Sequence, residues 1–101
     1  MSGRHRLANR RKHEVAEFEC DGVRFIAGIG RSVDGQIAEL FLNAGKPGCA
    51  AETAARDAAI ILSIALQHGC PLDTIQHALT KLADGKSPAG PIGRALEIFE
   101  G

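Results

Sequence analysis

The chain has 101 residues, 45% of them hydrophobic, and its 12 basic and 12 acidic residues give a formal net charge of zero. This length gives room for one domain, and a domain of this size can fold without disulfide or metal cross-links. The chain has no Trp or Tyr and only four Phe, which argues against a surface that stacks on nucleic-acid bases or sugars.

The charges are unevenly distributed along the chain. Residues 1–13 contain five basic residues and no acidic one, whereas the other seven basic residues share residues 14–101 with all twelve acidic ones, a net charge of −5. We therefore expect a flexible basic arm at 1–13, followed by one α+β domain at 14–101. The arm could bind the phosphates of a nucleic acid, keep the protein soluble, or dock on the acidic body of a neighbouring subunit. Its basic residues are Arg4, Arg6, Arg10, Arg11 and Lys12.

The first half of the domain has the pattern of β-strands. From Glu14 onward apolar and acidic residues alternate, Asp21-Gly22 is typical of a tight hairpin turn, and alternation resumes at Val23. A second Asp-Gly pair precedes another apolar segment, so we predict a three-stranded antiparallel meander. In the second strand Gly28 and Gly30 indicate a bulge or a close backbone contact. The acidic side chains Glu14, Glu17 and Glu19 are expected on the solvent face of an edge strand.

The second half has the pattern of helices. Apolar residues at three- and four-residue spacing predict a helix from Ala50 to His68, ended by Gly69. We expect a second helix from Pro71 to the Asp84-Gly85 pair and a third, short helix after Pro91. The expected fold is thus α+β, with two or three helices packed on one face of the meander.

The first helix has more apolar residues than one stripe can hold. Its predicted inner stripe includes Ala54, Ala58 and Ile61, with Asp57 partly buried beside them. Ile60 and Ile64 lie off that stripe, so either a second copy of the chain or the third helix would cover them. We expect a homo-oligomer.

The sequence contains no set of residues that is typical of a catalytic or metal site. Cys20, Cys49 and Cys70 are an odd number at wide spacing, which favours reduced thiols and a cytoplasmic protein, and no segment is suited to span a membrane. Cys49 and Cys70 each precede a predicted helix, where a thiol pKa is lowered, but about 27 Å of helix separates them. They are either small buried or capping residues or a redox or metal site. We expect no enzyme activity, no cofactor and no metal.

Several blocks resemble the TSCPD module, which occurs near the C-terminus of coenzyme-B12-dependent (class II) ribonucleotide reductases and in short standalone bacterial proteins. The blocks are Arg6–Arg11, Gly30-Arg31 with Asp34-Gly35, Glu39–Leu42, Lys46–Cys49 and Ser63–Leu72. The resemblance runs from about Arg4 to Leu96. It places the family's motif positions on Arg31, Asp34, Gly35, Glu39, Lys46, Gly48, Cys49, Asp57 and Gln67.

The resemblance implies an accessory or interaction module rather than catalysis. Our leading hypothesis is a non-enzymatic, dimeric protein whose partner is ribonucleotide reductase or another protein of nucleotide metabolism. The alternatives are a nucleic-acid-binding protein that uses the arm and a cysteine-based redox or metal-binding protein.

Overall fold

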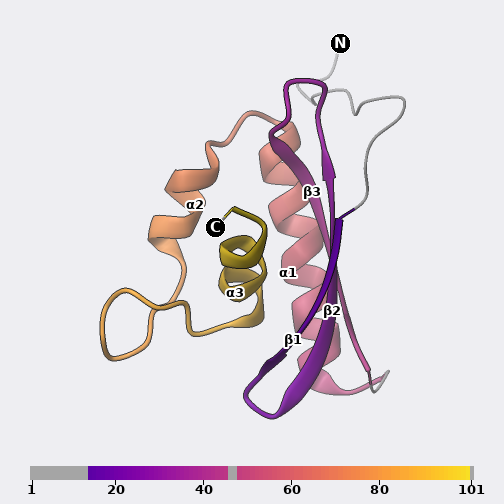
Figure 1. Ribbon diagram of the computed structural model, residues 1–101, viewed down its shortest axis with the longest axis vertical. Helices are drawn as coiled ribbons and strands as arrows, with labels where there is room; N and C mark the ends of the chain where they lie inside the picture. The colour runs from indigo at the N-terminus through magenta and orange to yellow at the C-terminus, as the bar shows by residue number, and fades with distance from the viewer. Residues whose placement is uncertain (1–13, 46–47, 101) are drawn as a thin grey trace.

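The computed structural model of the protein describes residues 14–45 and 48–100. Three antiparallel strands in the order β1-β2-β3 are followed by three helices, so the α+β class and the meander are confirmed (Figure 1). The elements are β1 (Glu14–Cys20), β2 (Val23–Arg31), β3 (Ile37–Ala44), α1 (Ala50–Gln67), α2 (Leu72–Ala78) and α3 (Pro91–Glu100).

The predicted turn between the first two strands is confirmed. Asp21 and Gly22 both have positive φ angles, 52° and 77°, which twist the turn in the sense that the flanking strands require. Cys20 therefore lies directly opposite Val23, and the whole register of β1 against β2 follows from this pair. The apolar alternate residues of β1 consequently face the core.

A bulge interrupts the pairing of β2 with β3. Gly30 is opposite Glu39, but the next residue, Arg31, is opposite Ile37, so Ala38 is an extra residue without a partner on β2. Gly30 is also in close contact with its neighbour, because a Cβ atom there would lie 2.5 Å from Oε2 of Glu39. The bulge that the glycines of this strand indicated is therefore present, and the atoms that crowd Gly30 belong to the Glu39 side chain and not to another backbone segment.

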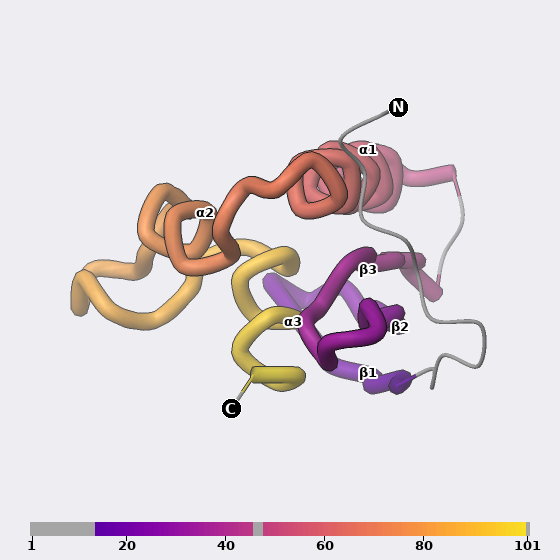
Figure 2. Tube along the Cα trace, turned by 90° about the horizontal axis from the view of Figure 1, so that it is seen from above, coloured from indigo at the N-terminus to yellow at the C-terminus, as the bar shows by residue number. Residues whose placement is uncertain are grey.

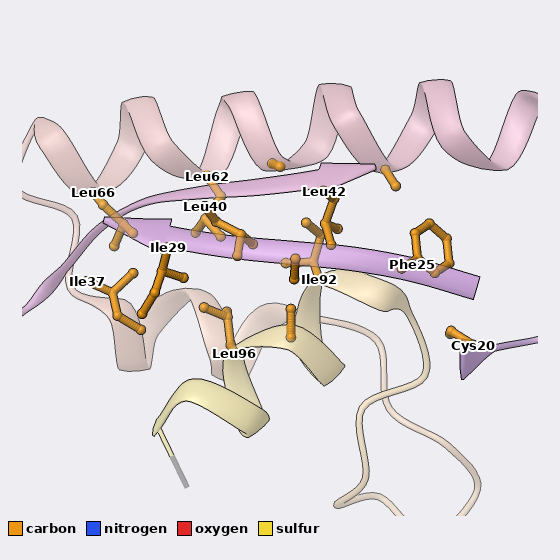
Figure 3. Packing of buried hydrophobic residues seen from close by; sticks show 14 of the residues in the cluster. Cys20, Phe25, Ile29, Ile37, Leu40, Leu42, Leu62, Leu66, Ile92 and Leu96 are labelled. Carbon is orange, nitrogen blue, oxygen red and sulfur yellow. The ribbon is translucent and has the colours of Figure 1, made fainter. Parts of the chain in front are cut away.

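One face of the sheet is buried under α1 and α3. The largest fully buried side chains come from three different elements: Ile29 from β2, Leu40 from β3 and Leu96 from α3 (Figure 3). Further residues pack around them at strand and helical spacings, which completes one continuous core. These residues are Cys20, Phe25, Ala27, Ile37, Leu42, Ala44, Ala55, Ala59, Leu62, Leu66, Ile92 and Ala95.

Helix α1 also covers the free edge of the sheet, since it lies alongside β3 (Figure 2). The Ser63 hydroxyl accepts a hydrogen bond from the Leu40 N–H (2.9 Å), and Nε2 of Gln67 donates to the Ala38 carbonyl (3.1 Å). Unpaired backbone groups on an edge strand invite pairing with other chains. Two side chains of α1 therefore bond to backbone groups of β3 at and next to the bulge.

The second helix is shorter than predicted. It ends at Ala78 instead of continuing to residue 83, and it has no buried residue. Leu79 is already extended, Leu82 N–H donates to the Ser87 carbonyl (2.8 Å), and Lys81 and Pro88 form an isolated bridge. Backbone pairing across this loop thus replaces the last turns of the expected helix.

Three smaller expectations were wrong. Asp57 is exposed, and Ile61 is 68% exposed, because the buried side of α1 is centred on Ala59 and Leu62, and Asp57 and Ile61 lie away from it. Glu14 does not belong to the solvent face with Glu17 and Glu19. It shares a face with the buried alternate residues of β1 and forms an ion pair there.

Candidate functional site

A pocket of about 460 Å³ lies at the end of the sheet where β2 turns into β3. Its walls come from the turn after β2, the C-terminal end of α1, the start of α2 and the last residue of α3. Residues from the segments 31–38 and 66–72 and from position 100 therefore meet here. The lining residues are Arg31, Ser32, Asp34, Gly35, Gln36, Ile37, Ala38, Leu66, Gly69, Cys70, Pro71, Leu72 and Glu100.

Arg31 joins the sheet to α3 beside this pocket. Its Nε donates to Oε2 of Glu14 at 2.6 Å, its Nη1 donates to the Gly35 carbonyl at 3.0 Å, and its Nη2 donates to the Phe99 carbonyl at 3.3 Å. The hydrogen bond to Glu14 raises the pKa of the guanidinium above its ordinary value, so Arg31 stays charged. With its donors used in this way, Arg31 fixes one wall of the pocket.

The turn that follows Arg31 is held by its own side chains. Ser32 Oγ donates to Oδ1 of Asp34, which also accepts from the Gln36 N–H at 3.3 Å. The Gly35 N–H donates to the Ser32 carbonyl at 2.9 Å. A short side chain that bonds to the backbone two residues later is typical of an Asx turn. The motif positions Asp34 and Gly35 thus form a well-ordered rim.

The opposite wall is the end of α1. Gly69 has φ of 92°, its N–H donates to the Leu66 carbonyl, and the Cys70 N–H donates to the Ala65 carbonyl (3.0 Å). These two bonds form a Schellman motif, which stops the helix and turns the chain toward α2. Two residues before Gly69, Gln67 is only 5% exposed and bonds to the bulged residue Ala38. The motif run 63–72 therefore closes the pocket and anchors it to the sheet.

Gly48 and Cys49 lie at the other end of α1, about 27 Å of helix away. Cys49 is the N-cap of the helix: its Sγ accepts from the Glu52 N–H at 3.4 Å. Oε1 of Glu52 accepts in return from the Gly48 N–H at 2.9 Å, an arrangement that resembles a capping box. The sequence left a capping role and a redox role open for Cys49, and this geometry favours capping.

The remaining motif positions are not part of the pocket. Glu39 lies on the other face of the sheet, next to Gly30, and Asp57 lies on the exposed side of α1. Lys46 and the basic residues of the arm lie outside the described residues. The structure therefore brings together four of the predicted positions, Arg31, Asp34, Gly35 and Gln67, of which the first three line the pocket.

The cysteines are all free. Cys20 is buried, and burial raises the pKa of its thiol, while the charge of Arg94 lowers it and that of Asp21 raises it further. Cys70 lines the pocket, where its thiol lies 3.9 Å from the Pro71 carbonyl. Within residues 14–45 and 48–100, no three His, Cys, Asp or Glu side chains are grouped so that they could hold a metal ion. The pocket's described side chains thus offer binding contacts of mixed polarity.

Sequence reasoning missed the role of Ser63 and that of Glu14. Ser63 interrupts an apolar segment and lies four residues before Gln67, so these two polar side chains lie on one flank of the helix. This polar pair was the available signal, because both side chains bond to backbone groups of β3. The partner of Glu14 could not be found this way, because the bulge that places Arg31 is a tertiary feature.

Comparison with known proteins gives consistent matches. The model of the TSCPD domain family matches residues 5–100. A vitamin B12-dependent ribonucleotide reductase of Bradyrhizobium diazoefficiens is 32% identical over 92 residues, which are 91% of this chain and 7% of the reductase. That of Agrobacterium fabrum is 32% identical over 77 residues, 76% of this chain and 6% of the reductase. The chain thus spans less than a tenth of these relatives. No solved structure matches it, and no described helix is long and apolar enough to cross a membrane.

Proposed function

The chain belongs to the TSCPD family, and from this premise we propose that it is a non-enzymatic accessory module that binds a protein of nucleotide metabolism. Ribonucleotide reductase is the first candidate, because the relatives in which this module is found are vitamin B12-dependent ribonucleotide reductases. In those relatives the module is part of the reductase chain. The same module as a separate chain is therefore suited to bind the rest of a reductase. We place this activity in the cytosol and include a second copy of the chain in the proposed assembly.

The observation that carries the proposal is the convergence of the motif blocks on one pocket. The turn Arg31–Ala38 and the segment Gly69–Leu72 lie far apart in the sequence, yet they form facing walls of the same hollow. Arg31 and Gln67 are used to hold those walls in place, through Glu14 and Ala38 respectively. The two walls are held in place by these hydrogen bonds, and polar and apolar groups are exposed between them. Such an arrangement is a preorganised surface for a partner.

The test is a quantitative capture experiment. The chain is immobilised and incubated with cytosol of its native organism, and mass spectrometry measures the enrichment of ribonucleotide reductase. Titration calorimetry with the purified reductase then measures the affinity. We expect Gln36→Arg combined with Leu72→Arg to lower capture on the order of tenfold, since both residues line the pocket. Leu82→Arg is the matched control, because Leu82 is exposed outside the pocket. The proposal is wrong if the wild-type chain enriches no reductase.

A second candidate function, nucleic-acid binding, is favoured by one observation, the +5 charge of residues 1–13 against −5 in the rest of the chain. Neutralising phosphates with basic side chains releases counterions, so such binding weakens steeply with salt. A gel-shift assay at two salt concentrations compares the full chain with a chain that lacks residues 1–12. Equal binding and equal salt dependence in both would exclude the arm as a nucleic-acid site.

A further inference from the structure

The side of α1 that faces away from the sheet is unusually apolar. Ile60, Ile61 and Ile64 are 55%, 68% and 47% exposed, although they lie within five residues of one another. Figure 2 shows α1 at the periphery of the molecule, with the sheet and α3 on its other side. Scattered single apolar residues are normal on a surface, but a cluster of this kind indicates a contact surface.

The spacing of this surface is that of a helix-pairing seam. Exposed residues recur at intervals of three, four, three and four along α1, at Ala54, Asp57, Ile61, Ile64 and His68. A 3,4 repeat is the heptad pattern with which two helices pack side by side. The flanking Ala58 and Ala65 are small, so a second helix can approach closely. We call these five exposed residues the α1 seam.

We propose that the α1 seam packs antiparallel against the same seam of a second copy of this chain. This inference deepens the proposed function, since it rests on the dimeric assembly included there and names its interface. A two-fold axis that runs between the two helices, level with residues 62 and 63, sets Ile61 against Ile64 of the partner subunit, and Ile64 against Ile61 of the partner subunit. The apolar centre of the seam is thus self-complementary, as an isologous contact requires.

The polar side chains at the two ends of the seam favour the antiparallel arrangement. The same two-fold axis sets Asp57 against His68 of the partner subunit, twice per dimer, so a carboxylate faces an imidazole at each end. A parallel arrangement in register would instead set Asp57 against Asp57 of the partner subunit, and like charges in contact are unfavourable. The seam therefore specifies both its partner and the direction of packing.

The size of the seam sets the expected affinity. An 18-residue helix is about 27 Å long and about 10–12 Å across, so a contact through α1 alone is smaller than the roughly 800 Å² per subunit of a standard interface. We therefore expect a dissociation constant in the micromolar range and not a permanent dimer. Because Gly69 and Cys70 follow His68 directly, the partner's helix would lie beside the pocket described above.

Sedimentation equilibrium of the full chain from about 1 µM to 1 mM tests this proposal. We expect a reversible dimer for the wild type, and a monomer over the whole range for Ile61→Asp, which would bury two unpaired carboxylates in the contact. Val33→Asp is the matched control, since Val33 is exposed outside α1, and it should dimerise like the wild type. Circular dichroism checks that each variant is folded.

A charge exchange tests the direction of packing. Asp57→Lys sets a cation against His68 of the partner subunit, so we expect dimerisation to weaken on the order of tenfold, and Asp57→Lys with His68→Asp should restore it. In a parallel dimer the double variant would not recover. If Ile61→Asp still dimerises, the α1 seam is not the interface. If the double variant does not regain dimerisation, the antiparallel register is wrong.

The two proposals fail separately. The reductase-capture assay is repeated with Ile61→Asp, whose pocket is intact. A wild-type chain that is monomeric at every concentration but still captures reductase refutes the seam and the dimer while the accessory role stands. A dimeric wild-type chain that captures no reductase refutes the accessory role alone.

Discussion

The hydroxyl of Ser63 offers the most direct test of how α1 protects the sheet. Ser63 Oγ accepts from the Leu40 N–H at 2.9 Å, and its proton can go to the carbonyl of Ala59 at 2.8 Å or to that of Leu40 at 3.2 Å. In a Ser63→Ala variant the Leu40 N–H, which belongs to a residue only 1% exposed, loses this partner.

The expected magnitude follows from two opposing effects. Leaving a buried N–H unsatisfied costs about 1–3 kcal/mol. Alanine is the better helix former, which returns about 0.5 kcal/mol. We therefore expect Ser63→Ala to lower the free energy of unfolding by about 0.5–2.5 kcal/mol, and each 1 kcal/mol corresponds to roughly 4–8 °C in Tm for a domain of this size.

Urea denaturation and hydrogen exchange together check this prediction. Thr53→Ala is the control, because it removes an exposed hydroxyl from the same helix and should leave stability unchanged or slightly higher. Hydrogen exchange of the Leu40 amide should be faster in Ser63→Ala than in the wild type or the control. If Ser63→Ala is as stable as Thr53→Ala and the Leu40 amide stays equally protected, the edge-covering role of α1 is refuted.

The remaining predictions concern single groups. Cys49→Ala should lower the free energy of unfolding by about 0.5–2 kcal/mol because α1 loses its cap, whereas Cys49→Ser should retain it, as measured by urea denaturation; equal loss in both variants would contradict the capping role. Hydrogen bonds from the Ser87 hydroxyl and from the N–H groups of Lys86 and Ser87 lower the pKa of Asp84. Its folded pKa is thus below its unfolded value, so its contribution to stability is present above about pH 4 and is lost as the pH falls through the lowered pKa. NMR titration should show this low midpoint, and Asp84→Asn should remove that part of the acid sensitivity. Cys20, which is 2% exposed and has a raised thiol pKa, should be the last cysteine alkylated by iodoacetamide in the native protein, as mass spectrometry can follow.

The strands and the first helix were predictable because local rules agree there. The alternation in β1 and the Asp21-Gly22 turn both specify a hairpin, and the spacing in α1 together with Gly69 specifies a helix and its end. The end of the second helix was not predictable in this way. The periodicity of residues 79–83 is compatible with a helix, but backbone pairing of Leu82 with Ser87 is a competing tertiary interaction that the pattern does not contain.

The candidate site was predictable only in part. The resemblance indicated Arg31, Asp34 and Gly35 as motif positions, but it did not show that they meet Gly69 and Cys70 across one pocket. That meeting depends on the length of α1, which carries the chain along β3 from one end of the sheet to the other. Residues whose role is to join two elements, such as Arg31 and Gln67, are recognised only once both elements are in place.

The position of α3 in the core has a consequence for how the protein is made. Leu96 and Ala95 are 0% exposed, α3 packs against β1, β2 and α1, and the Phe99 carbonyl accepts from Arg31. The sheet and α1 are synthesised before residues 91–100, so the part of the sheet that α3 covers stays exposed until that segment has emerged from the ribosome. A nascent chain arrested before residues 91–100 have emerged would therefore expose part of the core to chaperones, and one arrested after they have emerged would present the native fold.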